Sequence, residues 1–216
     1  MFNWRQRVIA ILLAILVGAG IGYVQIRTQK VVMQDQSSEN KKESVPPLAG
    51  ITLDAKFSLI DQNHKPVTEK SWPGQYLLVY FGFAHCPDVC PLGLSKIAEA
   101  LNALPKATAD RIQPLFITVD PARDTVKQMK DYVILFHPRL AGLTGSQEQV
   151  DATIKNFRVY AQKQIIPADQ GGDDQNYMMN HSSFTYLVAP DGKVADVFAH
   201  ETSAEDMATK LKAQIK

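Results

Sequence analysis

The run YLLVYFGF at residues 76–83 constrains the fold of this chain more than any other segment. It is apolar throughout and rich in β-forming residues, which is typical of a strand buried on both faces. Beyond a short break that contains two cysteines, apolar residues recur at helical spacing from Leu94 to Leu104, and Pro91 suits a first helical turn. A doubly buried strand followed by such a helix predicts an α/β fold.

The chain from residue 48 onward repeats this alternation of strand and helix. Apolar spacing, turn residues and capping residues predict a small N-terminal hairpin around the turn at 61–64 and a second hairpin around Pro190-Asp191-Gly192. Strands are expected at 56–60, 65–67, 112–119, 139–144, 183–189 and 193–198, and helices at 125–136, 146–157 and 203–214. An alternating pattern that ends in a hairpin and a helix predicts a thioredoxin-like central sheet flanked by helices.

The segment Val8–Val24 holds 17 residues without a charge, which is the short end of the length that a membrane-spanning helix needs. We expect a single N-terminal transmembrane helix, because a buried core helix rarely precedes a polar segment at an extreme N-terminus. A cleaved signal peptide is the main alternative, since Gly18-Ala19-Gly20 offers small residues of the kind that a peptidase accepts. With few residues before the span, the rest of the chain is expected on the extracytoplasmic (periplasmic) side.

Residues 29–47 are polar and end in Pro46-Pro47, which predicts a tether rather than a packed segment. As a flexible coil, these 19 residues would reach roughly 25 Å. We therefore expect an anchor at 1–28, a polar linker at 29–47 and the thioredoxin-like domain at 48–216. The formal net charge of +1 excludes a general basic field for nucleic acid.

The chain has two cysteines, Cys86 and Cys90, and they lie where the buried strand ends and the helix begins. Two thiols cannot build a multi-disulfide scaffold or a four-thiolate zinc site. The N-terminus of a helix lowers the pKa of a nearby thiol, so thiolate can form at neutral pH. Thiolate is the form that both disulfide exchange and the binding of a soft metal require.

The spacing C-x-x-x-C is one residue longer than the usual redox pair C-x-x-C. The extra residue lets both sulfurs converge on an ion while they stay close enough to oxidise. Two thiolates and one imidazole would suit Cu(I), a soft ion that accepts three ligands. A plain structural disulfide is the alternative, although it would close a very small loop and stabilise little.

Five histidines compete for the role of third ligand. His85 adjoins Cys86, but adjacent side chains leaving an extended strand point to opposite faces, which makes joint ligation awkward. His181 opens a predicted strand after a long polar loop and would return beside the cysteine turn in a thioredoxin-like topology. The remaining three are expected to be solvated or structural: His64, His137 and His200. Position alone leaves the choice open.

The segment FGFAHCPDVCP at 81–91 resembles the signature of the Sco/SenC family of copper-binding, membrane-anchored thioredoxin-fold proteins. Two further segments agree, namely VDPARDT at 119–125 and the pair His181-Ser182. The resemblance implies one copper ion per domain, as Cu(I) and in some states Cu(II), with Cys86, Cys90 and His181 as its ligands. It also implies that Asp120 is an acidic residue near the site, and that Arg123 and Asp124 begin the following helix.

The resemblance further implies a chaperone that assembles the dinuclear copper site of cytochrome c oxidase subunit II, with another copper carrier as donor. A thiol–disulfide oxidoreductase that uses Cys86 and Cys90 as catalytic residues is the alternative, and a copper or redox sensor is a third. A metallochaperone is preferred to an enzyme, because thiol exchange needs no histidine whereas strong copper binding uses His181.

This chain departs from the family pattern at several positions. Asn180 stands where the family often has an aspartate before the ligand histidine, so any outer-shell tuning of the imidazole must differ. Ala84 replaces a small hydroxylated residue. The acidic loop at 168–176 is expected to be solvated, with a lid that carries an extra Cu(II) ligand as the alternative. Met178 and Met179 are expected to serve packing.

Overall fold

The computed structural model describes residues 53–167 and 176–215 of this chain. Its strands are β1 (Ser58–Asp61), β2 (Pro66–Thr68), β3 (Tyr76–Gly82), β4 (Ile112–Thr118), β5 (Ala141–Thr144), β6 (Ala161–Ile165), β7 (Tyr177–His181), β8 (Thr185–Val188) and β9 (Val194–Phe198). Its helices are η1 (Glu69–Ser71), α2 (Val89–Ala103), α3 (Lys106–Ala109), α4 (Val126–Val133), α5 (Gln147–Phe157) and α6 (Ala204–Gln214).

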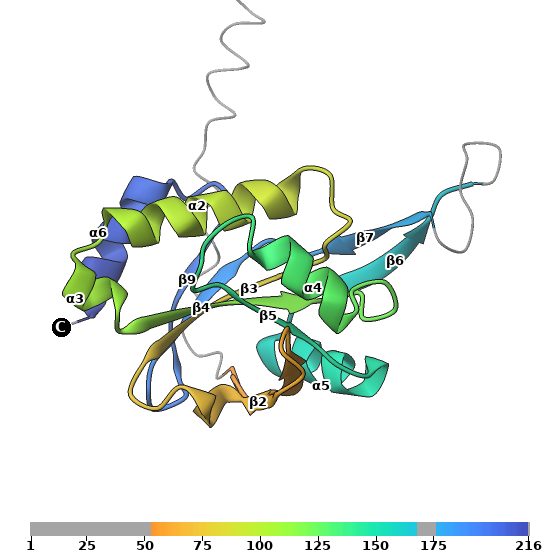
Figure 1. The fold of residues 1–216 in the computed structure, drawn as a ribbon. Helices are drawn as coiled ribbons and strands as arrows, with labels where there is room; N and C mark the ends of the chain where they lie inside the picture. The colour runs from red at the N-terminus through yellow and green to blue at the C-terminus, as the bar shows by residue number, and fades with distance from the viewer. Residues whose placement is uncertain (1–52, 168–175, 216) are drawn as a thin grey trace, which may run out of the picture. The chain divides into compact units, whose positions relative to one another are not determined.

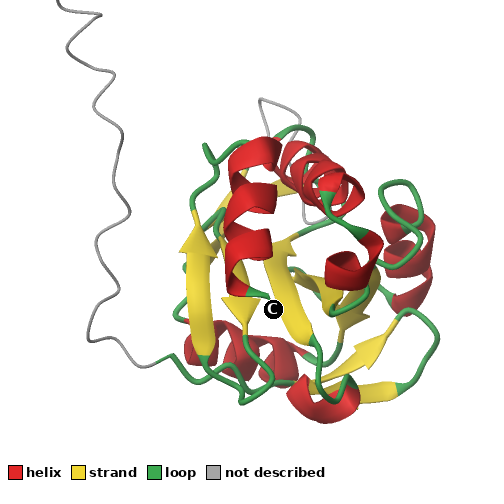
Figure 2. Cartoon of the chain, turned by 90° about the vertical axis from the view of Figure 1, so that its left-hand side faces the viewer, coloured by secondary structure: helices red, strands yellow, loops and turns green. Residues whose placement is uncertain are grey.

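Seven of these strands form one mixed sheet in the order β2-β1-β5-β4-β3-β8-β9. Strands β3, β4 and β5 are parallel, and β8 and β9 add to β3 as an antiparallel hairpin. Helices α2, α4 and α6 lie on one face of the sheet and α5 on the other, as Figures 1 and 2 show. The predicted thioredoxin-like α/β arrangement is confirmed, and the small N-terminal hairpin joins this sheet through β5.

Strand β3 lies at the centre of the hydrophobic core and is buried on both faces, as its apolar run predicts. Successive side chains of the strand pack against the helices on opposite faces of the sheet. The ring of Phe81 packs at 5.1 Å, edge to face, against Phe157 of α5. Tyr80 packs against Phe116 of the neighbouring strand and against α2 at Gly93, where an added Cβ would lie 2.8 Å from the tyrosine ring. The strand therefore holds α2 and α5 in fixed positions.

Three helices begin at residues whose side chains cap them, which explains the accuracy of the predicted starts. Thr125, Ser146 and Ser203 each accept a hydrogen bond from a backbone N–H in the first turn. Helix α4 ends at Val133, three residues earlier than predicted. Arg123 lies before α4 together with Asp124, so the expectation that these two residues begin the helix is wrong.

The antiparallel pair β6–β7 was not expected from the sequence. It forms a separate two-stranded ribbon, in which Ala161 pairs with His181 and Ile165 with Tyr177 (Figure 1). Four of the five β6 residues are exposed, so the strand lacks the apolar alternation by which a strand is recognised. His181 therefore ends β7; the prediction that it opens the next strand is wrong, because that strand begins at Thr185.

The predicted membrane anchor at Val8–Val24 and the linker at 29–47 lie outside the described residues. Over residues 53–167 and 176–215, none of the helices has the length and apolar character needed to cross a membrane.

Candidate metal-binding and redox site

The two cysteines occupy the junction between β3 and α2. The strand ends at Gly82, and a turn follows in which the Cys86 N–H donates to the Phe83 carbonyl at 3.2 Å. Helix α2 begins at Val89, so Cys90 lies in its first turn, and the Cys90 N–H donates to Cys86 Sγ at 3.4 Å. Both cysteines are free thiols and both are buried.

Gly82 provides the space that Cys90 occupies. A Cβ at residue 82 would lie 2.7 Å from Cys90 Sγ and 2.8 Å from the ring of Phe116. Any larger residue would therefore push the thiol out of its place between β3, β4 and α2. The glycine in the sequence Phe81-Gly82-Phe83 is explained by this close approach rather than by backbone conformation.

His181 reaches Cys90 from the end of β7. Its Nε2 lies 3.4 Å from Cys90 Sγ, and its Nδ1 lies 3.0 Å from the Ser182 carbonyl oxygen. A carbonyl can only accept a hydrogen bond, so the proton of the neutral imidazole belongs on Nδ1 and the Nε2 lone pair faces the thiol. Tyr80 and Phe83 meet the imidazole edge to face, at 6.5 and 5.9 Å between ring centroids.

The two thiols differ in protonation. Hydrogen bonding from the Cys90 side chain lowers the pKa of Cys86 to about 4, and further hydrogen bonds from the N–H groups of Asp88 and Cys90 act in the same direction. The pKa of Cys90 is raised by its pairing with Cys86 and by burial. At neutral pH the site therefore contains a Cys86 thiolate beside a Cys90 thiol.

Cys86, Cys90 and His181, the three expected metal ligands, thus lie close together, but their side chains are not arranged around a common point. Across the described residues, no three side chains of Cys, His, Asp or Glu are arranged so as to hold a metal ion as they stand. Cys90 contacts both Cys86 and His181, so the three donors are neighbours. Two sulfurs and one imidazole nitrogen make a soft donor set that fits copper once the side chains adjust.

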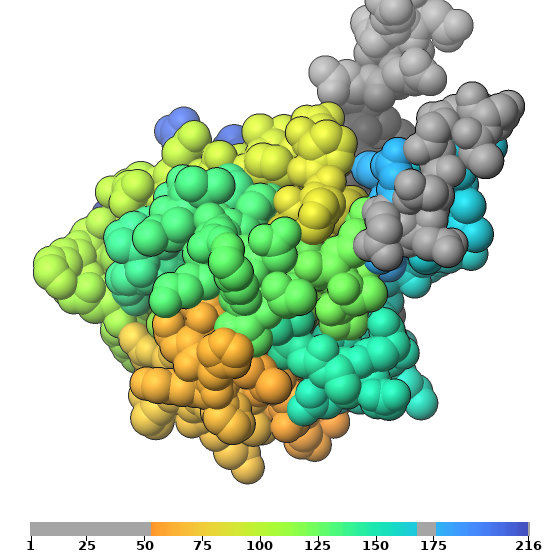
Figure 3. Space-filling model, turned by 45° about the vertical axis from the view of Figure 1, so that its right-hand side comes forward, coloured from red at the N-terminus to blue at the C-terminus, as the bar shows by residue number. Residues whose placement is uncertain are grey.

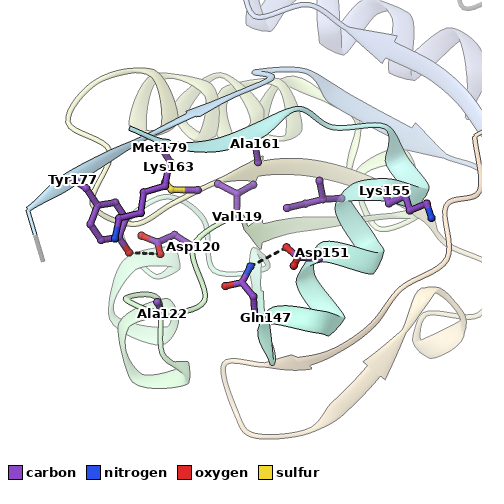
Figure 4. Close-up of a pocket in the computed structure, with 11 residues that line it drawn as sticks. Val119, Asp120, Ala122, Gln147, Asp151, Lys155, Ala161, Lys163, Tyr177 and Met179 are labelled. Atoms are coloured by element: carbon purple, nitrogen blue, oxygen red, sulfur yellow. Dashed lines mark hydrogen bonds between the residues drawn. The ribbon is translucent and has the colours of Figure 1, made fainter. Parts of the chain in front are cut away.

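Asp120 contacts the strand that carries His181. Its Oδ1 accepts a 2.7 Å hydrogen bond from Tyr177 Oη (Figure 4). Its Oδ2 lies 2.5 Å from Arg123 Nε. Arg123 also donates to the Tyr177 carbonyl and stacks on the Tyr177 ring at 3.6 Å. Asp120 therefore fastens β7 to the turn that follows β4, and it supports the site through the strand that ends in His181.

The carboxylate that contacts the cysteine segment belongs to Asp124, a role that the sequence did not indicate. The Asp124 side chain is fully buried, and its Oδ2 accepts hydrogen bonds from the Ala84 N–H at 3.0 Å and from Thr118 Oγ1 at 2.6 Å. Burial raises the pKa of this carboxyl group. The only signal in the sequence was its place in VDPARDT, just after a strand that runs parallel to β3.

The remaining sequence candidates lie at various points of the fold. Met178 and Met179 pack against the hydrophobic core, as predicted. Asn180 is exposed on β7, and the loop 168–175 is not among the described residues. Each of the three other histidines lies on a different segment: His64 in the turn between β1 and β2, His137 after α4, and His200 before α6.

A cavity of about 540 Å³ lies beneath the β6–β7 ribbon, between Asp120, Tyr177 and Met179 on one side and α5 on the other (Figure 4). Neither cysteine lines it, and His181 does not line it either. Figure 3 shows the surface on which the yellow segment before α2, the green segment after β4 and the blue end of the ribbon adjoin. Both thiols are buried, and neither lines the cavity.

Comparison with known proteins identifies relatives that cover nearly all of the described chain. The model of the SCO1/SenC family matches residues 47–216. The mitochondrial SCO2 homologue of Mus musculus is 38% identical over 207 residues, which span 95% of this chain and 78% of the mouse protein.

Solved structures agree with this match. ScoI of Bradyrhizobium japonicum with copper bound is 40% identical, with a TM-score of 0.66 over 74% of this chain and 98% of that chain. BsSco, a member of the Sco family of cytochrome c oxidase assembly proteins in which a disulfide switch was identified, is 26% identical. Its TM-score is 0.55 over 76% of this chain and 94% of its own.

The difference between the two thiols is testable by alkylation. We expect iodoacetamide to modify Cys86 first, at a rate that is constant from about pH 6 to about pH 8 and falls only as the pH approaches the pKa of about 4. In Cys90→Ala the strongest hydrogen bond to the thiolate is lost, so the profile should move to higher pH. Peptide mass spectrometry at each pH measures both. A Cys86 profile in the unaltered chain that rises only above about pH 8, like an ordinary thiol, would contradict this assignment.

Proposed function

This chain belongs to the SCO1/SenC family, and we propose that it is a copper chaperone that acts in the assembly of cytochrome c oxidase. The observation that carries the proposal is the meeting of Cys86, Cys90 and His181 Nε2 at the junction of β3 and α2. Copper is the cargo in this function. Support comes from ScoI, which contains copper, and from BsSco, which belongs to a family of oxidase assembly proteins.

The protonation of the site favours the capture of a cation. Cys86 is already a thiolate, and the Nδ1–H of His181 is held by the Ser182 carbonyl, which leaves Nε2 free to bind. Cys90 must release its proton, so we expect copper uptake to release about one proton near neutral pH. The rings of Tyr80 and Phe83 pack edge to face against the imidazole.

The proposed acceptor is subunit II of cytochrome c oxidase, at its dinuclear copper site, and the proposed donor is another copper carrier. The donor set favours Cu(I), since two sulfurs and one nitrogen suit a soft ion that does not require a fourth ligand. Zinc prefers a closed tetrahedral site, so we expect it to compete poorly.

The three expected ligands can be tested one at a time. The reduced chain should bind one copper, and Cys86→Ser, Cys90→Ser and His181→Ala should each weaken the affinity by more than about 100-fold, because each removes a direct donor. Affinity is measured by competition with a Cu(I) chelator. The matched control is His64→Ala, since His64 is exposed in a turn between β1 and β2. Unchanged affinity in His181→Ala would remove this residue from the site.

A thiol–disulfide oxidoreductase is the second candidate function, and the thiolate of Cys86 beside the buried thiol of Cys90 favours it. In this reaction Cys86 attacks a substrate disulfide, the S–S bond breaks, and one substrate thiolate leaves. Cys90, once deprotonated, attacks the sulfur of Cys86 and releases the second substrate thiolate. The pair is then oxidised by two electrons and the substrate is reduced by two.

The variant His181→Ala separates the two functions, because it removes a copper donor and keeps both thiols. We expect Cys86 and Cys90 to oxidise reversibly to a disulfide in this variant and in the unaltered chain, with loss of copper from the latter. If the chain is a copper chaperone, His181→Ala should fail to support oxidase assembly. Oxidase activity in cells that carry the variant measures this, and full activity would favour the oxidoreductase.

We also propose that residues 1–28 anchor the chain in a membrane and that residues 48–216 form the copper-binding domain on its extracytoplasmic side, joined by the linker at 29–47. The support is the uncharged stretch Val8–Val24. Protease added to spheroplasts should digest the domain and leave the N-terminal span protected. A chain recovered in the cytosolic fraction would overturn this proposal.

A further inference from the structure

The carboxylate of Asp124 has one oxygen that the fold leaves unsatisfied. The side chain is fully buried, and Oδ2 already accepts two hydrogen bonds, from Ala84 and from Thr118. Oδ1 is also buried, and among the described residues it has no hydrogen-bond partner. A buried carboxylate oxygen without a donor is costly, so its position calls for a reason. The group that faces it is the imidazole of His85, whose Nδ1 lies 3.5 Å away.

His85 occupies a turn and not a strand, which changes the geometry expected from the sequence. Strand β3 ends at Gly82, so the rule that neighbouring side chains alternate between two faces does not apply at His85 and Cys86. The His85 side chain is 42% exposed, whereas Cys86 and Cys90 are buried. His85 is therefore a solvent-exposed imidazole next to the buried cysteines.

The orientation of the ring matches that of a metal ligand. Histidines that bind metals usually direct their second ring nitrogen at a carboxylate or a carbonyl, which fixes the ring and makes the ligating nitrogen more basic. His85 directs Nδ1 at Asp124, and no hydrogen bond within the described ranges engages its Nε2. His181 directs its Nδ1 at the Ser182 carbonyl, at the shorter distance of 3.0 Å. The site thus has two oriented imidazoles, one beside the buried thiol and one at the surface.

We propose that His85 is an exchange ligand, whose Nε2 binds copper as the ion passes between the donor set of Cys86, Cys90 and His181 and a partner protein. This inference rests on the proposed copper function. Copper leaves by forming a bond to Nε2 of His85 as a bond to one of these three donors breaks. No electron is transferred, and the Nδ1 proton stays on the ring, where binding of the cation draws it into a hydrogen bond with Asp124 Oδ1. Loading follows the reverse order.

The test separates the rate of exchange from the strength of binding. The full-length chain is loaded with one Cu(I), and transfer to an excess of bicinchoninate is followed by stopped-flow absorbance. In His85→Ala we expect the equilibrium affinity to stay within about twofold, because His85 is not one of the three proposed ligands. Transfer should slow by at least about tenfold. His64→Ala, which removes another exposed imidazole, should transfer at the unaltered rate.

A second variant tests the role of Asp124 as a positioning residue. In Asp124→Asn the amide oxygen can still accept from Ala84 and Thr118, while its NH₂ group faces His85 and no longer holds the Nδ1 proton. We expect a slowing similar to that of His85→Ala, and no further slowing in the double variant, because both changes disable the same imidazole. Additive slowing would show that Asp124 acts by another route.

Two outcomes would overturn the proposal. Transfer from His85→Ala at the unaltered rate would show that copper does not pass through this residue. A loss of affinity in His85→Ala as large as that in Cys86→Ser would make His85 a permanent ligand instead. The equilibrium measurement on the unaltered chain separates this failure from a failure of the proposed function. If the unaltered chain binds no copper, the copper function itself is wrong. If it binds copper and His85→Ala transfers copper at the unaltered rate, only the exchange ligand is wrong.

Discussion

The contact between Cys90 Sγ and His181 Nε2 joins two segments that lie 91 positions apart in the chain, and the geometry of the site depends on it. Cys90 is held from one side by the end of β3, where Gly82 leaves just enough space for the sulfur. His181 is held from the other side by β7, which Tyr177 fastens to Asp120 and Arg123. Neither segment makes a three-donor site alone. The central sheet and the β6–β7 ribbon must both be in place before two sulfurs and an imidazole can meet.

The contact between the two cysteines explains why the pKa values of their thiols are shifted in opposite directions. Two thiolates in contact would repel each other, so the pair keeps one proton, and the more deeply buried sulfur of Cys90 retains it. The Cys86 thiolate is then stabilised by that thiol and by backbone N–H groups at the start of α2. This arrangement is suited to either proposed chemistry. A thiolate at the surface end of the pair can attack a disulfide or capture a cation, and the buried thiol can follow once it loses its proton.

Much of this fold follows from the sequence, because its central elements have strong and local signals. The apolar run of β3, the spacing of α2 and the capping residues Thr125, Ser146 and Ser203 each act within a few residues. Strand β6 has no such signal, since its side chains are mostly exposed and its order comes from backbone pairing with β7. For the same reason the sequence predicts that His181 lies beside the cysteines but assigns it to the wrong strand. The sequence also does not show how Asp120 and Asp124 divide their roles, because burial and hydrogen bonding decide which of these two carboxylates contacts the cysteine segment.

A copper carrier faces two requirements that oppose each other, and the described site divides them between its parts. Tight binding favours shielded donors in fixed positions, such as the buried Cys90 thiol and the half-buried His181 ring, because shielding limits the access of water and competing ligands. Release favours a donor that a partner can reach, and the sulfur of Cys90 is fully buried. Asp124 links the two regions physically: one of its oxygens ties the turn before Cys86 to β4, and the other faces the exposed ring of His85. A single buried carboxylate can thereby fix the cysteine segment and orient a surface imidazole. The strength of copper binding and the rate of copper release then depend on different residues, so one can change without the other.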